Sequence, residues 1–297
     1  MPDAALRISV VLHHQAAAGV VRLALSLAQS VRLARAEGLV GPALLRFGDC
    51  GPDAPTLRPA DLEALRAELG DELAVELTVF DDNLGHGGGQ NALAADLTED
   101  LLLVINPDTV AEPLLVSRLV ERFTDPRVGV VEARQLPVEH PKTHDADGTT
   151  SWASMACAML RASAVREVGL FDAETFFLHG DDVDLSWRMR LAGWSVVHEP
   201  RARVFHDKQI DDESGYIVPS AAERVQGPLG TLLLAWKWSL DDDLEPLRTQ
   251  LLQGSEDQQE AVRLFDERRA AGRLPERLDA EGRVASFVAG NPGRRRF

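Results

Sequence analysis

The chain has 297 residues, of which 45% are hydrophobic, enough for one large domain with a buried core and a smaller extension. Its 31 basic and 47 acidic residues give a formal net charge of −16. Nucleic-acid-binding proteins rely on basic surfaces that displace counterions, so this charge argues against a nucleic-acid partner.

Cysteine usage and hydropathy bear on the compartment. Cys50 and Cys157 are far apart and have no metal-type spacing, so we expect no disulfide and a reducing cytoplasm. The N-terminal segment lacks a basic stretch followed by a long apolar run, and no run of about 18 apolar residues occurs, which predicts neither export nor a membrane span. Leu229–Trp238 is the longest apolar candidate. We expect a core helix there, with a helix resting on the inner membrane surface as the alternative.

The first half of the chain alternates strands and helices. Short apolar runs predict strands at Ile8–Leu12, Ala43–Phe47, Ala74–Phe80 and Leu101–Ile105. Helical spacing predicts helices at Ala16–Ala36, Arg58–Glu68 and from Asn91 onward. This order predicts an α/β fold with a doubly wound, mostly parallel sheet flanked by helices. Ligands of such sheets bind beyond the carboxyl ends of the strands, here residues 48–53, 81–91 and 106–109.

The pattern changes after Val128. Short strands and loops are expected there, and the polar segment Glu139–Ser151 is predicted to be mobile, as a lid would be. After about residue 207 the sequence becomes acidic and helical. We therefore predict a first domain over 1–207 and a helical C-terminal extension over 208–297, whose Trp236 and Trp238 would cover the acceptor side or pair two subunits as a homodimer.

Three polar segments follow predicted strands or begin helices. Asn106-Pro107-Asp108-Thr109 directly follows an apolar strand and suits either a turn or a carboxylate site for Mg²⁺ or Mn²⁺. The glycine-rich loop from Asp81 to Asn91 is neither a Walker loop nor a GxGxxG motif, and it indicates only that something packs closely against it.

The third segment holds three acids in four residues, Asp181, Asp182 and Asp184, at a predicted helix start. Helix capping accounts for one or two of them. Mutual repulsion would raise the pKa of at least one carboxyl group toward that of a useful base, so capping and catalysis both stay open. His206 ends a short apolar strand, where an ordinary surface or core histidine is the alternative to a functional one.

These pieces, in this order, resemble bacterial glycosyltransferase family 2, particularly its rhamnosyltransferase-like members, over roughly residues 8–206. The most specific matches are Trp152, ACAMLR at 156–161, VGLFD at 168–172, GDDVDLSWR at 180–188, LAGW at 191–194, HEP at 198–200 and His206. The resemblance implies a GT-A fold.

The resemblance also implies roles. Asp182 would be the general base, with Asp181 as the runner-up. Asp108 would be the last acid of a DxD-type motif that begins here with Asn106, and His206 would complete a Mn²⁺ or Mg²⁺ site. The nucleotide sugar would contact Asn83, Gly85, Asn91, Asn106, Asp108 and Trp152.

The chain departs from the family pattern at several positions. His13-His14-Gln15 replaces a Thr-Tyr-Asn type sequence after the first strand, and Gly48 stands where an acid is usual. Asp49 or Asp53 would then contact the base or ribose. Ala156 stands where glycine is common, and Asn106 replaces the first acid of the metal motif, which weakens the expected metal affinity.

The resemblance implies an inverting transfer from a UDP- or dTDP-type sugar donor to a hydroxyl acceptor such as a glycan or a lipid-linked glycan, in bacterial cell-surface polysaccharide or glycoconjugate synthesis. The altered ends of the first two strands favour an alternative, a GT-A protein that binds a nucleotide sugar or glycan without turnover. A sugar nucleotidyltransferase is disfavoured, because it would need a glycine-rich basic loop after the first strand.

Overall fold

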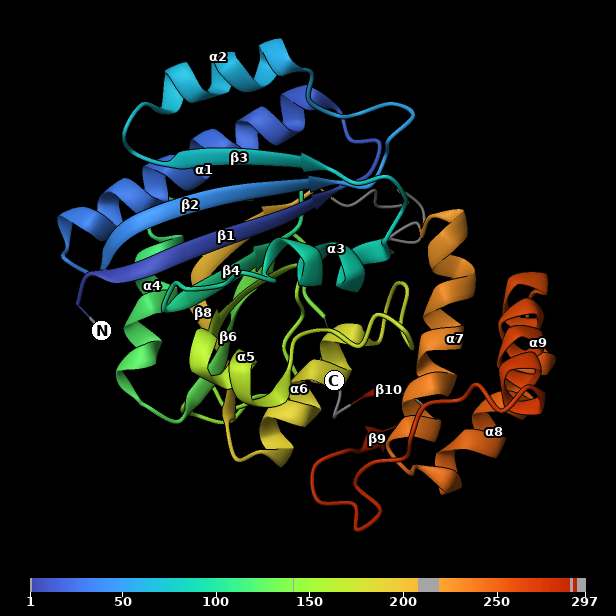
Figure 1. The fold of residues 1–297 in the computed structure, drawn as a ribbon. Helices are drawn as coiled ribbons and strands as arrows, with labels where there is room; N and C mark the ends of the chain where they lie inside the picture. Colours follow the sequence, from blue (N-terminus) through green and yellow to red (C-terminus); the bar gives the residue numbers. More distant parts are fainter. Residues whose placement is uncertain (1, 141, 208–218, 289–290, 293–297) are drawn as a thin grey trace.

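The computed structural model describes residues 2–140, 142–207, 219–288 and 291–292. Its centre is an eight-stranded sheet in the order β3-β2-β1-β4-β7-β6-β8-β5. The strands are β1 (Ala4–Leu12), β2 (Val40–Asp49), β3 (Ala74–Val79), β4 (Leu101–Ile105), β5 (Thr109–Ala111), β6 (Val128–Leu136), β7 (Cys157–Arg161) and β8 (Ser195–His206). The predicted α/β class is confirmed (Figure 1).

The two halves of the sheet differ in strand direction. β3, β2, β1 and β4 are parallel neighbours, as their alternation with helices predicts. β7 runs antiparallel to both β4 and β6, whereas β6 and β8 are parallel. β6 and β8 are also long, so the prediction of only short strands after Val128 was wrong. β4 is buried at all five residues because it lies in the middle of the sheet.

Helices cover both faces of the sheet. α1 (Ala17–Ala36), α2 (Pro59–Leu69) and α4 (Leu115–Glu121) form one layer, followed by the short 3-10 helix η1 (Arg122–Thr124). α3 (Gly85–Leu93), α5 (Ala162–Val168) and α6 (Asp181–Leu191) form the other. α1 buries Leu23, Leu27 and Val31 completely, at the spacing of one helix face. It is also the one helix in the described part of the chain that is long and apolar enough to cross a membrane, a test that buried core helices also pass.

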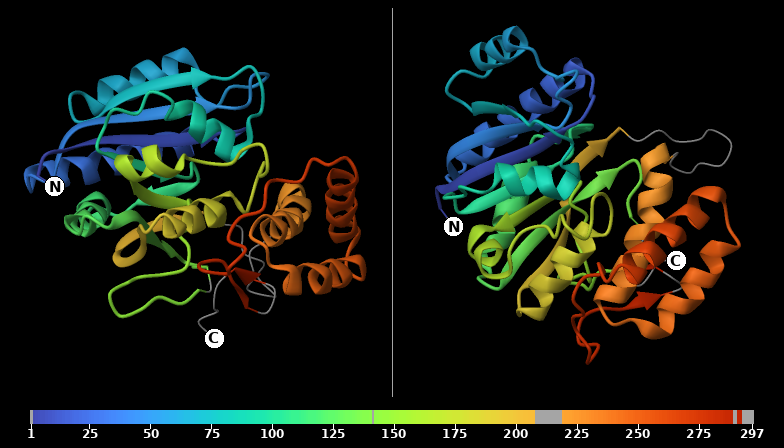
Figure 2. Two further views of the ribbon diagram at one scale, coloured as in Figure 1. Left: turned by 60° about the horizontal axis from the view of Figure 1, so that its bottom comes forward. Right: turned by 45° about the vertical axis from the view of Figure 1, so that its right-hand side comes forward.

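The C-terminal part is mainly helical. α7 (Ala221–Lys237), α8 (Asp241–Leu252) and α9 (Glu256–Ala270) group at one side of the sheet, and the strand pair β9 (Phe287–Val288) and β10 (Asn291–Pro292) follows (Figures 1 and 2). Ser220 and Ser255 cap α7 and α9, each with an acidic or amide partner three residues on. Leu229–Trp238 lies within or directly after α7 and is largely buried, so the expectation of a core helix there is confirmed. The predicted domain boundary between residues 207 and 208 lies next to residues outside the described ranges. The segment 293–297 lies outside them as well.

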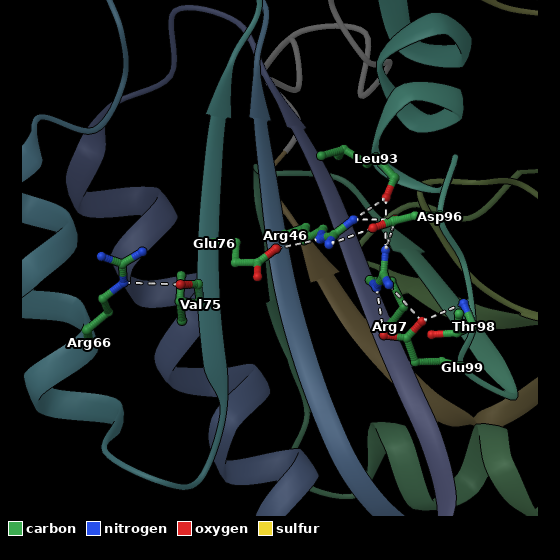
Figure 3. A network of polar contacts seen from close by, with 9 residues as sticks. All are labelled: Arg7, Arg46, Arg66, Val75, Glu76, Leu93, Asp96, Thr98 and Glu99. Atoms are coloured by element: carbon green, nitrogen blue, oxygen red, sulfur yellow. Dashed lines mark hydrogen bonds and ion pairs between the residues drawn. The ribbon is translucent and has the colours of Figure 1, made fainter.

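An ion-pair network fixes the end of α3 to the sheet (Figure 3). Arg7 on β1 is 2% exposed and reaches Asp96 and Glu99 at 3.0 and 2.8 Å. Arg46 on the neighbouring β2 contacts Asp96 at 2.5 Å and Glu76 at 2.6 Å. Hydrogen bonds from Arg46 and Arg7 hold the pKa of Asp96 well below its usual range. This network sets the position of α3, whose first turn reaches the site described next.

Candidate active site

A cavity of about 360 Å³ lies where several strands of the sheet end. Asn106 directly follows β4, Gln135 lies on β6, and His206 is the last residue of β8. This is the edge at which ligands of doubly wound sheets bind. The remaining wall is formed by the start of α3, the start of α6, the segment after β6, residues 154–156 and α7, through His86, Val138, Glu139, His140, Ser154, Met155, Ala156, Leu178, His179, Asp181, Asp182 and Glu223.

A tight turn places the acidic cluster at the cavity. His179 and Gly180 both have positive φ, 67° and 88°, and α6 begins at the next residue. α7 packs closely against this turn, since a Cβ at Gly230 would lie 2.6 Å from the carbonyl oxygen of His179. The start of α6 is therefore fixed by the C-terminal helices.

The three acids of α6 have different surroundings. Asp181 and Asp182 line the cavity. Asp184 is fully buried against the end of α7, where it accepts hydrogen bonds from Arg188 at 2.8 Å and Trp238 at 3.0 Å and pairs with Lys237 at 2.7 Å. Asp184 is therefore a structural residue that ties α6 to α7, and it accounts for one of the three acids.

Asp181 and Asp182, the two acids that line the cavity, have different electrostatic surroundings. Asp181 Oδ2 lies 2.7 Å from His86 Nδ1 on α3. Asp182 accepts a hydrogen bond from the amide of Val183 at 2.8 Å. Desolvation, together with repulsion from Asp181, raises the pKa of Asp182 to about 7. A carboxylate with such a pKa is suited to proton transfer near neutral pH.

Asp108 and His206 lie side by side at the strand ends. His206 Nε2 is 3.1 Å from Asp108 Oδ1, and His206 Nδ1 is 2.8 Å from Gln135 Oε1. Because the Gln135 oxygen accepts from Nδ1–H, Nε2 faces the carboxylate, and two such atoms need a proton or a metal cation between them. Mg²⁺ and Mn²⁺ often use few protein ligands and complete their shell with phosphate oxygens and water, so this pair fits such a cation. Among the described residues, no three histidine, cysteine, aspartate or glutamate side chains gather as a metal cluster.

Four residues predicted to contact the nucleotide sugar have other contacts. Asp49 is fully buried and accepts hydrogen bonds from the amides of Gly51 and Thr56, which folds the loop after β2. Asn91 bonds both the amide and the carbonyl of Phe171, at 2.9 and 2.8 Å. These two polar side chains serve local structure, because their hydrogen-bonding atoms already have protein partners.

Gly85 and Trp152 also have close contacts within the protein. A Cβ at Gly85 would lie 2.4 Å from the carbonyl oxygen of Phe177, so this glycine allows close packing. Trp152 is not among the lining residues; its Nε1–H donates to the carbonyl of Pro292 at 3.0 Å. Its chain neighbours Ser154 and Ala156 line the cavity instead. The helix expected from Asn91 starts at Gly85, because the glycines of this segment pack against β1 and Phe171 instead of forming an open loop.

The residues that depart from the family pattern at the ends of β1 and β2 lie beside residues that follow β3. Asn83 Nδ2 lies 3.1 Å from His13 Nε2, and Asn83 Oδ1 accepts from the amide of Gly85 at 3.0 Å. A Cβ at Gly48 would lie 2.6 Å from the ring of Phe80, so the acid usual at this position would not fit beside Phe80. Asp53, the other candidate replacement, is exposed. Asn83 and His13 therefore lie together near the predicted ligand edge.

The sequence did not predict a buried ionic group next to the cavity wall. Lys142 and Glu132 form an ion pair with side-chain exposures of 4% and 1%. His198 lies 3.6 Å from Glu132 and 3.0 Å from Glu139. The segment predicted to be a mobile lid is thus anchored by a buried pair. An isolated bridge, His144–Thr150, lies within it, and another, Thr149–Val197, connects it to β8. The only sequence signal was a lysine among polar residues, which is no guide to burial.

The chain matches no protein-family model. It is 28% identical to an N-acetylglucosaminyl-diphospho-decaprenol L-rhamnosyltransferase of Mycobacterium tuberculosis, over 42% of this chain and 56% of the relative. It is 29% identical to a pre-mycofactocin glycosyltransferase of the same species, over 47% and 33% respectively. The chain thus spans about half or less of the length of these curated relatives.

Solved structures share the fold at low identity. The mannosyltransferase PcManGT of Pyrobaculum calidifontis, in complex with GDP-Man and Mn²⁺, superposes with a TM-score of 0.58 at 13% identity, over 95% of this chain and 80% of that one. GalNAc-T7, with UDP, GalNAc and Mn²⁺, gives 0.65 at 12% identity, over 92% and 59%. The chain has the GT-A fold of glycosyltransferases. The resemblance to rhamnosyltransferase-like members of glycosyltransferase family 2 is confirmed.

Proposed function

We propose that this GT-A chain is an inverting glycosyltransferase that moves a sugar from a UDP- or dTDP-type donor to a hydroxyl acceptor, in bacterial cell-surface polysaccharide or glycoconjugate synthesis. One observation carries the proposal. The same cavity is lined by Asp182, whose pKa is raised to about 7, and by His206, which adjoins Asp108. A base and a site for the donor's diphosphate are the two parts that such a transfer needs.

The chemistry assigned to the chain is a single displacement. Asp182 takes the proton of the acceptor hydroxyl as its oxygen attacks the anomeric carbon of the sugar. The bond from that carbon to the diphosphate oxygen breaks, and the nucleoside diphosphate leaves with the electron pair. Asp108 and His206 would hold Mn²⁺ or Mg²⁺, which when bound offsets the negative charge that grows on the leaving diphosphate.

The relatives suggest which substrates to test first. The curated relative named for L-rhamnosyl transfer acts on a diphospho-decaprenol-linked saccharide, so deoxyhexose donors and lipid-linked acceptors lead the list. PcManGT was solved with GDP-Man and GalNAc-T7 with UDP, so both nucleotide types belong in the panel.

A donor screen tests the proposal. Nucleotide sugars are incubated with the protein and Mn²⁺, and the released nucleoside diphosphate is measured. Asp182→Asn should bind the same donor with nearly unchanged affinity and lose at least about 100-fold in release, the range of a general base. Asp71→Asn, an exposed residue between α2 and β3, is the control.

Two outcomes would count against the proposal. Unchanged turnover in Asp182→Asn would remove that residue as the base. Donor binding without release or transfer in the wild type would favour the alternative, a GT-A protein that binds nucleotide sugars without turnover.

A further inference from the structure

His86 occupies a position in the cavity that the sequence motifs did not single out. It lies in the first turn of α3, and its side chain is 18% exposed. It lines the cavity together with Asp181 and Asp182, which come from α6. Two elements far apart in sequence thus bring an imidazole to the two acids.

The imidazole of His86 is held in one orientation. Nδ1 lies 2.7 Å from Asp181 Oδ2, and the ring of Phe171 meets the imidazole edge to face at 5.2 Å between centroids. The next residue, Gly87, fixes the backbone, since a Cβ there would lie 2.9 Å from Phe171 Cβ. A ring held on two sides and by its backbone is preorganised for a contact on its remaining edge.

That remaining edge carries a polar atom. His86 Nε2 is buried and has no hydrogen-bond partner among the described residues. A buried nitrogen left without a partner is costly, so most such atoms are paired in folded proteins. Because His86 lines the cavity, a bound ligand is positioned to supply the missing partner.

The charges nearby select the kind of ligand. Asp181 and Asp182 would repel a diphosphate at this wall, whereas Asp108 and His206 offer a cation-bridged place for it. A sugar hydroxyl is neutral and accepts a hydrogen bond without that repulsion. The ligand atom that suits His86 is therefore a hydroxyl oxygen.

We infer that His86 Nε2 hydrogen-bonds a hydroxyl of the transferred sugar, and that Asp181 acts as a positioning residue that orients the imidazole, leaving Asp182 as the base. The inference rests on the proposed function. The charge state is consistent with it. Burial opposes the charged imidazole, but Asp181 and Asp182 outweigh that effect and raise the pKa of His86, which favours Nε2–H as a donor near neutral pH.

Two substitutions separate the roles of the two ring nitrogens. In His86→Asn the side-chain amide stands near the place of Nδ1, so it keeps the contact to Asp181 and loses the cavity contact. In His86→Gln the amide reaches the place of Nε2. Calorimetry with dTDP-L-rhamnose and with dTDP alone serves as the binding probe, and thermal unfolding verifies that each variant is folded.

The inference predicts that His86→Asn binds dTDP-L-rhamnose about tenfold more weakly, the scale of one hydrogen bond, while its affinity for dTDP alone is unchanged. His86→Gln should stay within about threefold of the wild type for both. Equal loss for dTDP alone would overturn the sugar contact, and so would an asparagine variant that binds like the wild type. If the wild type binds no nucleotide sugar of the panel, the proposed function falls too; if it binds and both variants match it, only this inference falls.

Discussion

The pairing of β5 with β8 brings His206 to Asp108, with Nε2 and Oδ1 3.1 Å apart and Thr109 as the register partner of His206. If this pair holds a divalent cation, Mn²⁺ or Mg²⁺ should strengthen UDP or dTDP binding about tenfold or more. In Asp108→Asn and His206→Asn the metal should no longer matter. Calorimetry with and without the ion measures both affinities.

The neighbouring Asp207 provides a control for the metal prediction. Its side chain is 79% exposed, and its carboxylate lies a long 3.9 Å from the guanidinium of Arg22. Asp207→Asn should therefore keep the full effect of the metal. A wild-type affinity that is indifferent to both ions would remove Asp108 and His206 from the proposed metal site.

The raised pKa of Asp182 predicts how activity depends on pH. A general base must be ionised, so kcat/KM should fall about tenfold per pH unit below about pH 7. Asp181→Asn removes a neighbouring negative charge and should move this acid limb to lower pH, while weakening sugar binding through His86. Rates of donor hydrolysis between pH 5 and pH 9 test this. A rate that stays constant from pH 7 down to pH 5 would mean that another group limits the reaction.

Stability should respond in opposite directions to two substitutions on α6. The folded-state pKa of Asp182 lies above its unfolded value, so the folded protein binds more protons, and stability declines as pH rises from about 4 to about 7. Asp182→Asn should therefore raise the free energy of unfolding by about 1–3 kcal/mol at pH 8 and leave it nearly unchanged at pH 4. Urea unfolding at the two pH values measures the difference.

Asp184→Asn is the matched counterpart, two residues further along α6. It removes the buried carboxylate partner of Arg188 and one of the two carboxylates that pair with Lys237, the other being Asp172. This should lower the free energy of unfolding by about 2–4 kcal/mol at pH 8. Equal effects of the two substitutions would contradict the division into a functional and a structural aspartate.

The sequence predicted those parts of the fold whose determinants are local. The apolar runs of β1 and β4 and the helical spacing of α1 follow from side-chain burial along a few residues, and they placed Asn106 and Asp108 at a strand end. The contact of His86 with Asp181 joins α3 to α6. No local sequence pattern indicates a contact between residues so far apart along the chain. The contacts of Asp49 and Asn91 are non-obvious for a similar reason: their partners are backbone groups, which every residue carries and no sequence pattern marks.

The buried pair of Lys142 and Glu132 should control the segment that forms part of the cavity wall through Val138, Glu139 and His140. Lys142→Met leaves Glu132 buried beside His198 without its main counter-charge. We expect a loss of about 3–5 kcal/mol in the free energy of unfolding and faster proteolysis near this segment. Since the wall loosens, KM for the donor should rise more than kcat falls. The double variant Glu132→Gln with Lys142→Met removes both charges and should recover much of the lost stability, because no unpaired charge then stays buried. Urea unfolding and limited proteolysis of the single and double variants measure this, and a double variant less stable than Lys142→Met would show that the segment is held by other contacts.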